Sequence, residues 1–403
     1  MKVLGYGFPL PGNFGGPSVV HGLGELVRRL DAGAEFVYYA RGGLDGVCAS
    51  DMAFRVRVNP YEDRPLRLLR DYLAVRFLGL RPHSPEKREF WEDFLAADVV
   101  VYAYAICFHY KRRDAAVARP FRAALRRALH VTGLSLLARL TGRRSVKSSA
   151  SYGPMPSPYY RWLARITAGF FHVLVARERE SARMMREEAG VKRPVPVAPD
   201  LGNLMPVGNV APVAGRVGIA VSFQIVRQWQ GRAEDYVRCM RELVRHVCRE
   251  PGREVVLIPN QFLLSAGPND EAIAREILSG LEPGLDCRVL DAAHCGALEV
   301  KRQIAACELL VSSRYHASVA GFSAGVPQVI VGWHHKYAEL AGLYGQNDCV
   351  MGSEDCSVAA LLRAFDAVWR RRAEVRRELV RRRADVERQL LESGRLMLGL
   401  EER

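Results

Sequence analysis

The feature that most constrains the fold is a regular alternation of strand-like and helix-like segments in the second half of the chain. The predicted strands are residues 217–221, 254–258, 287–290 and 308–311. The predicted helices between them are residues 233–249, 270–281 and 296–306. Short β-branched runs separated by longer amphipathic segments are typical of a parallel sheet with helices on both faces. We therefore expect a Rossmann-like domain here.

Candidate functional side chains follow the last two strands of this domain. Ser313 ends one strand, Arg314 and His316 come directly after it, and Lys336 follows the next strand, residues 328–331. Ligands of open parallel sheets bind at the carboxyl ends of the strands, and the amino end of the following helix favours an anion. The three cationic side chains can thus converge on one anionic ligand, although an Arg-x-His pair alone is more often a feature of a surface loop.

The first half of the chain predicts a second α/β domain with less regular spacing. Strands are expected at residues 2–5, 35–39, 54–58, 98–104, 146–151 and 171–176. A glycine-rich loop leads from the first strand to Ser18, the predicted N-cap of a helix over residues 19–30. The loop can bring backbone N–H groups to a phosphate or carboxylate, but its spacing matches neither the dinucleotide fingerprint nor the P-loop. Residues 201–215 have the composition of a linker.

The motifs, taken in order, resemble those of the polysaccharide pyruvyl transferase family. The resemblance is strongest from Ser312 to Lys336, where an S-x-R-x-H motif begins a helix, Gly325-Val326-Pro327 opens the next strand and a lysine follows it. Earlier matches are the Asn13-Phe14-Gly15 loop, Gly153-Pro154, Arg177 to Ser181, which is similar to R-[DE]-x-x-S, and the strand-end Asp200. The chain departs from the pattern at Gly16, where relatives have an acid, and at Ala105 to Phe108, where they have glycines.

The resemblance implies two Rossmann-like parallel-sheet domains that face each other across a cleft, a GT-B-like architecture. Residues 1–205 would form the acceptor side, residues 206–355 the donor side, and residues 356–403 a long basic C-terminal helix. The implied activity moves the pyruvyl group of phosphoenolpyruvate onto two hydroxyls of a sugar in a polysaccharide or lipid-linked glycan precursor, and releases phosphate. The departures leave open whether the donor is still phosphoenolpyruvate, and the acceptor is not predicted.

The donor's carboxylate and phosphate would need several cations. Arg177 and Arg314 are the candidates for bidentate binding, and Lys336 would be a point charge on the phosphate. His316 is the candidate general acid/base, because imidazole titrates near neutral pH. The resemblance adds Asn13, and Ser313 stands beside Arg314 as a further substrate contact. No cofactor or metal is predicted, since the cysteines and histidines lack ligand spacing.

A formal charge of +14 favours anionic partners: nucleic acid, an anionic membrane surface or a phosphorylated substrate. No zinc-finger, RNP or KH pattern is present, so no specific nucleic-acid partner is expected. The arginine-rich segment 357–397 could lie on an anionic membrane, contact a second subunit or extend as a solvated tail. Without a membrane-spanning run or a signal-peptide core, a cytoplasmic protein is expected, with the inner face of the membrane as an alternative location.

Two rival functions stay open at this stage. A nucleotide-sugar glycosyltransferase could use the same architecture, and the arginines would then bind the diphosphate of the donor. A basic nucleic-acid-binding or scaffold protein would account for the charge alone. The sequence predicts no oligomeric state.

Overall fold

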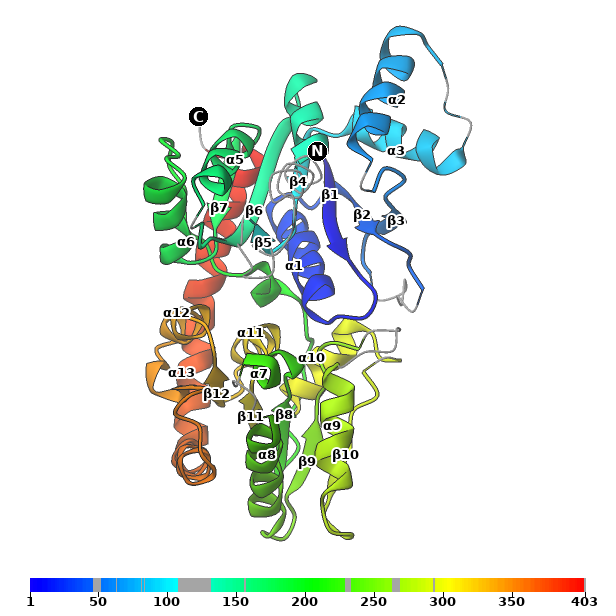
Figure 1. Cartoon of the computed structure of the whole chain (residues 1–403). Coiled ribbons are helices and arrows are strands. Elements are labelled where there is room, and N and C mark those ends of the chain that lie inside the picture. Colours follow the sequence, from blue (N-terminus) through cyan, green and yellow to red (C-terminus); the bar gives the residue numbers. More distant parts are fainter. Residues whose placement is uncertain are drawn as a thin grey trace.

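The computed structural model describes residues 1–45, 52–62, 64–80, 82, 84–107, 132–155, 157–228, 233–262, 269–292 and 294–401. Two α/β domains are stacked one above the other, and a long C-terminal helix runs beside both of them (Figure 1). Phe108, one of the positions where the chain departs from the pyruvyl transferase pattern, lies outside the described residues.

The N-terminal domain is built on a parallel sheet. Within the described ranges it has seven strands in the order β3-β2-β1-β4-β6-β5, with β7 beside β6. The strands are β1 (Lys2–Pro9), β2 (Glu35–Arg41), β3 (Arg55–Val58), β4 (Val99–Tyr102), β5 (Ile106–Cys107), β6 (Arg144–Tyr152) and β7 (Val173–Ala176). The described helices are α1 (Gly15–Leu30), α2 (Pro65–Phe77), α3 (Pro85–Ala96), α5 (Pro158–Ala168) and α6 (Arg179–Arg183), with a π-helical turn at Met184–Glu188 and a 3₁₀ turn at Leu201–Leu204. Helices cover both faces of the sheet, so central strands such as β4 are wholly apolar and buried.

The C-terminal domain confirms the predicted alternation. Its six described strands are all parallel, in the order β10-β9-β8-β11-β12-β13. They are β8 (Arg216–Ala220), β9 (Glu254–Leu257), β10 (Cys287–Val289), β11 (Leu309–Ser312), β12 (Gln328–Gly332) and β13 (Val350–Gly352). The helices are α7 (Phe223–Gln228), α8 (Ala233–Cys248), α9 (Asp270–Ser279), α10 (Ala297–Ala305), α11 (Tyr315–Ser323), α12 (Lys336–Leu343) and α13 (Val358–Leu398), with a 3₁₀ turn at Asn347–Cys349. This is the Rossmann strand order, which reverses between β8 and β11, and ligands of such sheets bind at that reversal.

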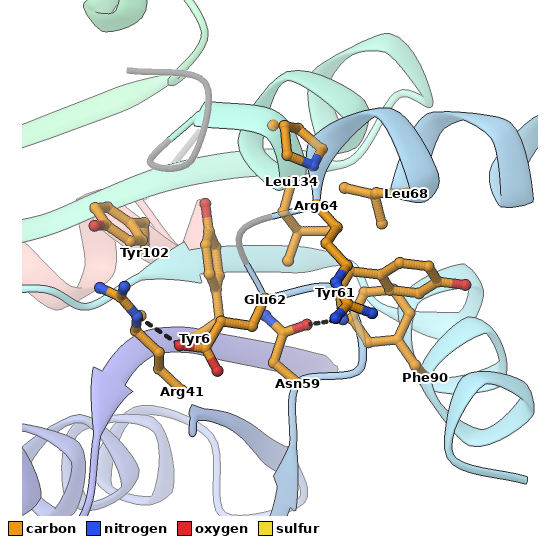
Figure 2. Close-up of a pocket in the computed structure, with 13 residues that line it drawn as sticks. Tyr6, Arg41, Asn59, Tyr61, Glu62, Arg64, Leu68, Phe90, Tyr102 and Leu134 are labelled. Atoms are coloured by element: carbon orange, nitrogen blue, oxygen red, sulfur yellow. Dashed lines mark hydrogen bonds and ion pairs between the residues drawn. The ribbon is translucent and has the colours of Figure 1, made fainter. Parts of the chain in front are cut away.

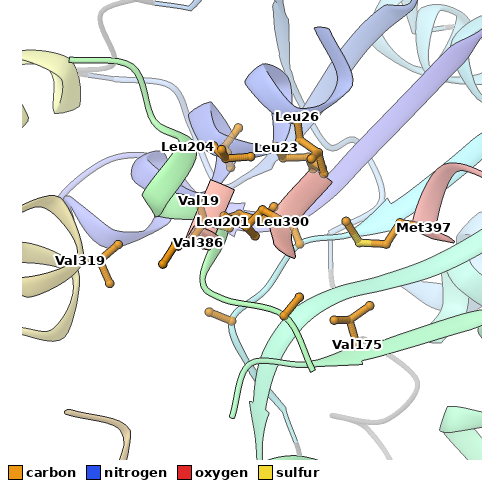
Figure 3. Packing of buried hydrophobic residues seen from close by; sticks show 14 of the residues in the cluster. Val19, Leu23, Leu26, Val175, Leu201, Leu204, Val319, Val386, Leu390 and Met397 are labelled. Carbon is orange, nitrogen blue, oxygen red and sulfur yellow. The ribbon is translucent and has the colours of Figure 1, made fainter. Parts of the chain in front are cut away.

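Helix α13 packs along both domains instead of ending as a tail. Leu361 and Phe365 are buried in the core of the C-terminal domain. Val386 and Leu390, further along the helix, are buried against α1 and the turn at Leu201–Leu204 (Figure 3). Each fully buried leucine contributes about 1.5–3 kcal/mol. The apolar face of α13 is therefore used within the molecule. Some of its exposed arginines pair with glutamates of the same helix, namely Arg371, Arg381, Arg382 and Arg383.

The glycine-rich loop joins the two domains through its backbone. The Phe14 N–H donates to the Asn260 carbonyl at 2.9 Å, and the Phe262 N–H donates to the Gly12 carbonyl at 3.0 Å. Helix α1 begins at Gly15, so the predicted start at Val19 with Ser18 as N-cap is wrong. Ser18 lies within the first turn, where its hydroxyl donates to the Gly15 carbonyl. The helix starts early because loop–domain hydrogen bonds fix the preceding residues.

The predicted linker is ordered at its start, because Leu201–Leu204 form a buried 3₁₀ turn. Among the described residues, no helix is both long and apolar enough to cross a membrane.

Candidate functional site

Arg314 follows β11 at the point where the strand order reverses, and a buried carboxylate holds it there. Its Nε donates to Asp270 Oδ2 at 2.6 Å, and its Nη2 bonds Asp270 Oδ1 and, at 3.2 Å, Gln261 Oε1. Asp270 is fully buried at the amino end of α9 and also accepts from the backbone N–H groups of Phe223 and Asn260. One carboxylate thus ties together the ends of β8, β9 and β11. The third guanidinium nitrogen of Arg314, Nη1, makes no hydrogen bond within the described residues.

Tyr315 is a platform between cations from the two domains. The Arg177 guanidinium carbon lies 4.4 Å from the centre of the Tyr315 ring, and the Lys336 ammonium lies 5.2 Å from it. Arg177 follows β7 of the N-terminal domain, whereas Tyr315 and Lys336 follow β11 and β12 of the C-terminal domain. The carboxyl ends of the two sheets therefore meet here, as the predicted architecture requires.

Lys336 has no carboxylate partner among the described residues. Its ammonium is surrounded by the rings of Tyr315, Trp333 (4.9 Å) and Tyr337 (5.7 Å). Burial lowers the pKa of the Lys336 ammonium to about 7, and the nearby Arg177 adds to the effect. A lysine with this pKa gains a proton readily when an anion binds beside it.

Arg177 is buried in a network with two carboxylates. Its Nε donates to Glu178 Oε1 at 2.8 Å and its Nη1 donates to Asp200 Oδ2 at 2.7 Å. Its Nη2 bonds the Ser151 hydroxyl. The side chain is 2% exposed, so all three nitrogens are committed inside the protein. Arg177 contacts Asp200 and the Tyr315 ring, and its direct contact with the donor stays a prediction.

The R-[DE]-x-x-S motif explains this network. The Glu178 carboxylate accepts hydrogen bonds from Ser151 at 2.6 Å and from Ser181 at 2.7 Å, in addition to Arg177. Burial alone would raise the pKa of the Glu178 carboxyl, but Arg177 and the serine hydroxyls lower it to about 2. The motif thus ties β6, β7 and α6 together beneath Tyr315.

His316 lies against the first turn of α1. A side chain at Gly15 would collide with the His316 imidazole, which explains a glycine at that position. His316 Nε2 is 3.7 Å from Asp200 Oδ2 and has no hydrogen-bond partner among the described residues. Withdrawal from water lowers the pKa of the imidazole to about 4. Asp200 acts in the opposite direction, but Arg177, Lys336 and Arg314 lower the pKa further. The imidazole is therefore neutral at pH 7 and able to accept a proton.

Asn13 and Ser313 flank these residues in different ways. Asn13 is exposed and pairs with Gln261 across the domain boundary, while its Oδ1 accepts from the Gly15 N–H at 2.7 Å. Ser313 is 1% exposed, and its hydroxyl accepts from Tyr236 at 3.0 Å. Their substrate contacts stay predictions. A Cβ at Gly16 would lie 2.8 Å from the Pro9 carbonyl oxygen, so the backbone here has no room for the acid found in relatives.

Sequence reasoning missed Tyr315 and Asp270. Tyr315 occupies a variable position of S-x-R-x-H, so no motif marks it. Asp270 lies 44 residues before Arg314, and its only signal was an acid at the start of a predicted helix. Asp200, a strand-end match to the family pattern, caps the following turn by accepting from the Gly202 N–H at 2.8 Å. Its additional contact with Arg177 depends on the tertiary fold.

A separate pocket lies at the carboxyl ends of β1, β2 and β3 in the N-terminal domain (Figure 2). Arg41 Nε donates to Glu62 Oε1 at 2.7 Å, and Asn59 accepts from the Tyr61 N–H at 2.9 Å. The aromatic ring of Tyr102 lines the same pocket. Ala105, a position of departure from the pyruvyl transferase pattern, is buried in the neighbouring core. Polar and aromatic groups therefore gather on the side where the sugar acceptor is expected.

A family model described as polysaccharide pyruvyl transferase matches residues 117–335, more than half of the 403 residues. The match includes Arg177, Arg314 and His316, and it ends one residue before Lys336. The chain belongs to the polysaccharide pyruvyl transferase family. No curated protein matches this family member.

Solved structures support the architecture of this pyruvyl transferase family member. A trehalose-6-phosphate synthase aligns with a TM-score of 0.56 at 11% identity, covering 99% of this chain and 98% of its own. The UDP-GlcNAc 2-epimerase of Methanocaldococcus jannaschii aligns with a TM-score of 0.54 at 13% identity, covering 91% of this chain and 92% of its own. A spinosyn rhamnosyltransferase aligns with a TM-score of 0.51 at 13% identity, covering 98% of this chain and 100% of its own. At these identities the likeness shows the fold alone, which is GT-B-like.

Proposed function

We propose that this protein transfers the pyruvyl group of phosphoenolpyruvate onto two hydroxyls of a sugar, forming a cyclic ketal and releasing phosphate. The observation that carries the proposal is the grouping of Arg314, His316 and Lys336 around the end of β11. Arg314 and His316 lie inside the segment that matches the family, and Lys336 follows it directly. Two cations and a neutral imidazole suit a small donor that carries both a carboxylate and a phosphate. The sugar acceptor is proposed to bind on the N-terminal domain.

The chemistry divides into an addition and a substitution. One sugar hydroxyl bonds to C2 of the donor while the C3 methylene gains a proton to become a methyl group. His316 takes the proton of that hydroxyl and can return it to C3, so one residue is base and then acid. The second hydroxyl then displaces phosphate at C2, and its proton leaves with the phosphate, so that diol and phosphoenolpyruvate give ketal and phosphate.

Charge stabilisation comes from residues that the protein fixes before the donor binds. Asp270 holds the Arg314 fork in one orientation and leaves Nη1 for the donor. Lys336 lies on aromatic rings rather than on a carboxylate, so its charge is not already neutralised by an ion pair. Preorganised cations of this kind stabilise negative charge on the leaving phosphate.

The decisive assay separates pyruvyl transfer from phosphoenolpyruvate from glycosyl transfer from a nucleotide sugar. The protein is incubated with a panel of glycan acceptors and either phosphoenolpyruvate or nucleotide sugars, and inorganic phosphate and nucleoside diphosphate are measured. Acceptor-dependent phosphate release from phosphoenolpyruvate is expected. Acceptor-dependent release of a nucleoside diphosphate would instead establish the glycosyltransferase alternative and reject the proposal.

The donor contact of Arg314 makes a testable prediction. Arg314→Lys keeps a positive charge beside Asp270 but removes the fork, and charge-assisted hydrogen bonds contribute about 1.5–3 kcal/mol each. We expect phosphoenolpyruvate to bind about 10–100-fold more weakly, measured by calorimetry. Gln261→Ala is the matched control, because it removes the neutral partner of Arg314 and keeps the guanidinium. Unchanged donor affinity in Arg314→Lys would exclude the contact.

Lys336 predicts a pH dependence of donor binding. Its ammonium has a pKa of about 7, so it loses its proton as the pH rises above 7, and phosphoenolpyruvate affinity is expected to fall in that range. Ionisation of the donor does not explain such a fall, since phosphate monoesters have a second pKa of ~6 and are already mostly dianionic at pH 7. Lys336→Arg keeps its charge and should show a flat affinity between pH 7 and 9. A wild-type affinity that does not change across this range would contradict the assignment.

A further inference from the structure

Helix α2 carries its apolar side chains on the outside. Leu66, Leu69, Leu73 and Phe77 recur at spacings of three and four residues, so they share one face of the helix. They are 80%, 46%, 46% and 71% exposed, whereas Leu68 is the buried residue of α2. An ordinary surface helix turns its apolar stripe toward the core and its polar side toward water. In α2 the side that faces water is apolar as well. We call Leu66, Leu69, Leu73 and Phe77 the outer face of α2.

The outer face continues past the end of α2. Leu78 and Leu80 are 70% and 56% exposed. Leu80 also lines a groove between α2 and α3 together with Pro82 and Leu95, and the α3 wall of this groove carries Arg88, Glu89 and Glu92. A contiguous exposed apolar surface of this kind marks an interaction site rather than scattered surface leucines.

The flanks of the outer face are basic. Arg64, Arg67, Arg70 and Arg76 are exposed in this stretch, against the single carboxylate of Asp71. By helical spacing Arg70 lies on one side of the apolar stripe and Arg76 on the other. Asp71 is already neutralised by Lys87 at 2.7 Å and by Arg70. The outer face of α2 therefore combines an apolar centre with arginines of the same helix on both sides of it.

We propose that the outer face of α2 binds an anionic lipid bilayer, with the leucines and Phe77 inserted among the acyl chains and the arginines extended to the headgroups. This combination of a leucine- and phenylalanine-bearing face with flanking arginines is the chemistry of helices that lie in the membrane interface. A second copy of the chain fits less well, because it would bring one set of arginines against another in a protein of net charge +14. The proposal stands independently of the donor chemistry.

The position of α2 in the fold suits this role. Helices α2 and α3 project from the margin of the N-terminal domain beyond β2 and β3, away from the C-terminal domain (Figure 1). The arginine-rich helix α13 offers no comparable face, because Val386 and Leu390 are buried in the interdomain core. The membrane contact that the sequence suggested for the C-terminal helix is thus reassigned to α2.

The test is flotation of the full-length protein with vesicles of phosphatidylcholine alone or with phosphatidylglycerol at one part in four. Binding is expected only to the anionic vesicles at 0.1 M salt, and it should weaken at 0.5 M, where charges are screened. Leu73→Ser with Phe77→Ser should reduce binding at least tenfold, and Arg70→Glu with Arg76→Glu should do the same. All substituted side chains are exposed, so unchanged melting temperatures are expected.

Matched controls lie on α13. Val380 is 57% exposed and Arg381 is 73% exposed, so Val380→Ser and Arg381→Glu remove an exposed apolar and an exposed basic side chain elsewhere. They should leave vesicle binding within twofold of wild type. Absence of wild-type binding to anionic vesicles, or equal loss in the α13 controls, overturns the proposal. A dimer in solution that the Leu73→Ser and Phe77→Ser pair converts to a monomer would assign the face to a subunit contact and would also overturn it.

Discussion

Replacement of His316 by asparagine is expected to lower kcat about 10²–10⁴-fold while phosphoenolpyruvate binds with nearly unchanged affinity. The asparagine keeps a polar side chain against Gly15 but cannot accept a proton from a sugar hydroxyl. Steady-state phosphate release, measured with saturating donor and acceptor, gives kcat, and calorimetry gives the donor affinity. The two measurements together separate loss of chemistry from loss of binding.

The pH profile gives a second signature for His316. As a base the imidazole must be neutral, so activity is lost as the pH falls through its pKa of about 4 rather than near the ordinary value of 6.5. The acid limb of kcat/KM, which reports the free enzyme, is therefore expected near pH 4 and should disappear in His316→Asn. The control is His294→Ala, an exposed histidine paired with Asp291 in the same domain. Equal kcat in His316→Asn and wild type would remove His316 from the mechanism.

The C-terminal domain could be predicted from the sequence because its signals are local. Apolar runs such as Leu309 to Val311 end in polar residues, and the parallel sheet then requires those residues to share one edge. The positions of Arg314, His316 and Lys336 relative to the sheet follow from that rule and from the resemblance to the family. The start of α1 could not be predicted, because hydrogen bonds to Asn260 and Phe262, distant in sequence, fix it.

The availability of a side chain was harder to predict than its position. Arg177 was placed correctly at the end of a strand. Its guanidinium nitrogens are occupied by hydrogen bonds to Asp200 and Ser151, which approach it only in the folded chain. The same holds for Tyr315, which becomes a platform only when two domains bring Arg177 and Lys336 to its ring. A motif identifies residues by type and spacing, whereas their partners are set by tertiary contacts.

The buried network predicts a large loss of stability in Arg177→Met. Methionine can keep the packing against Tyr315, but it leaves Glu178 and Asp200 as unpaired buried carboxylates, and breaking a buried pair typically costs about 3–5 kcal/mol. Urea unfolding at pH 7 should show a decrease of this size in the free energy of unfolding. Arg183→Met is the matched control, since Arg183 makes a solvent-exposed ion pair with Glu180, and its loss should leave the free energy of unfolding nearly unchanged.

The cost of Arg177→Met should shrink as the solution becomes acidic. The pKa of Glu178 in the folded protein is about 2, below its ordinary value of 4.5, so its contribution to stability is present above pH 4.5 and is lost as the pH falls toward 2. In Arg177→Met the unpaired Glu178 carboxylate can take up a proton at a higher pH. The variant then no longer carries the cost of an unpaired buried charge, while the wild type loses stability as the pH falls. The difference in unfolding free energy between the two proteins is therefore expected to be smaller at pH 4 than at pH 7. A difference that stays constant with pH would mean that Arg177 stabilises the fold through packing rather than through its charge.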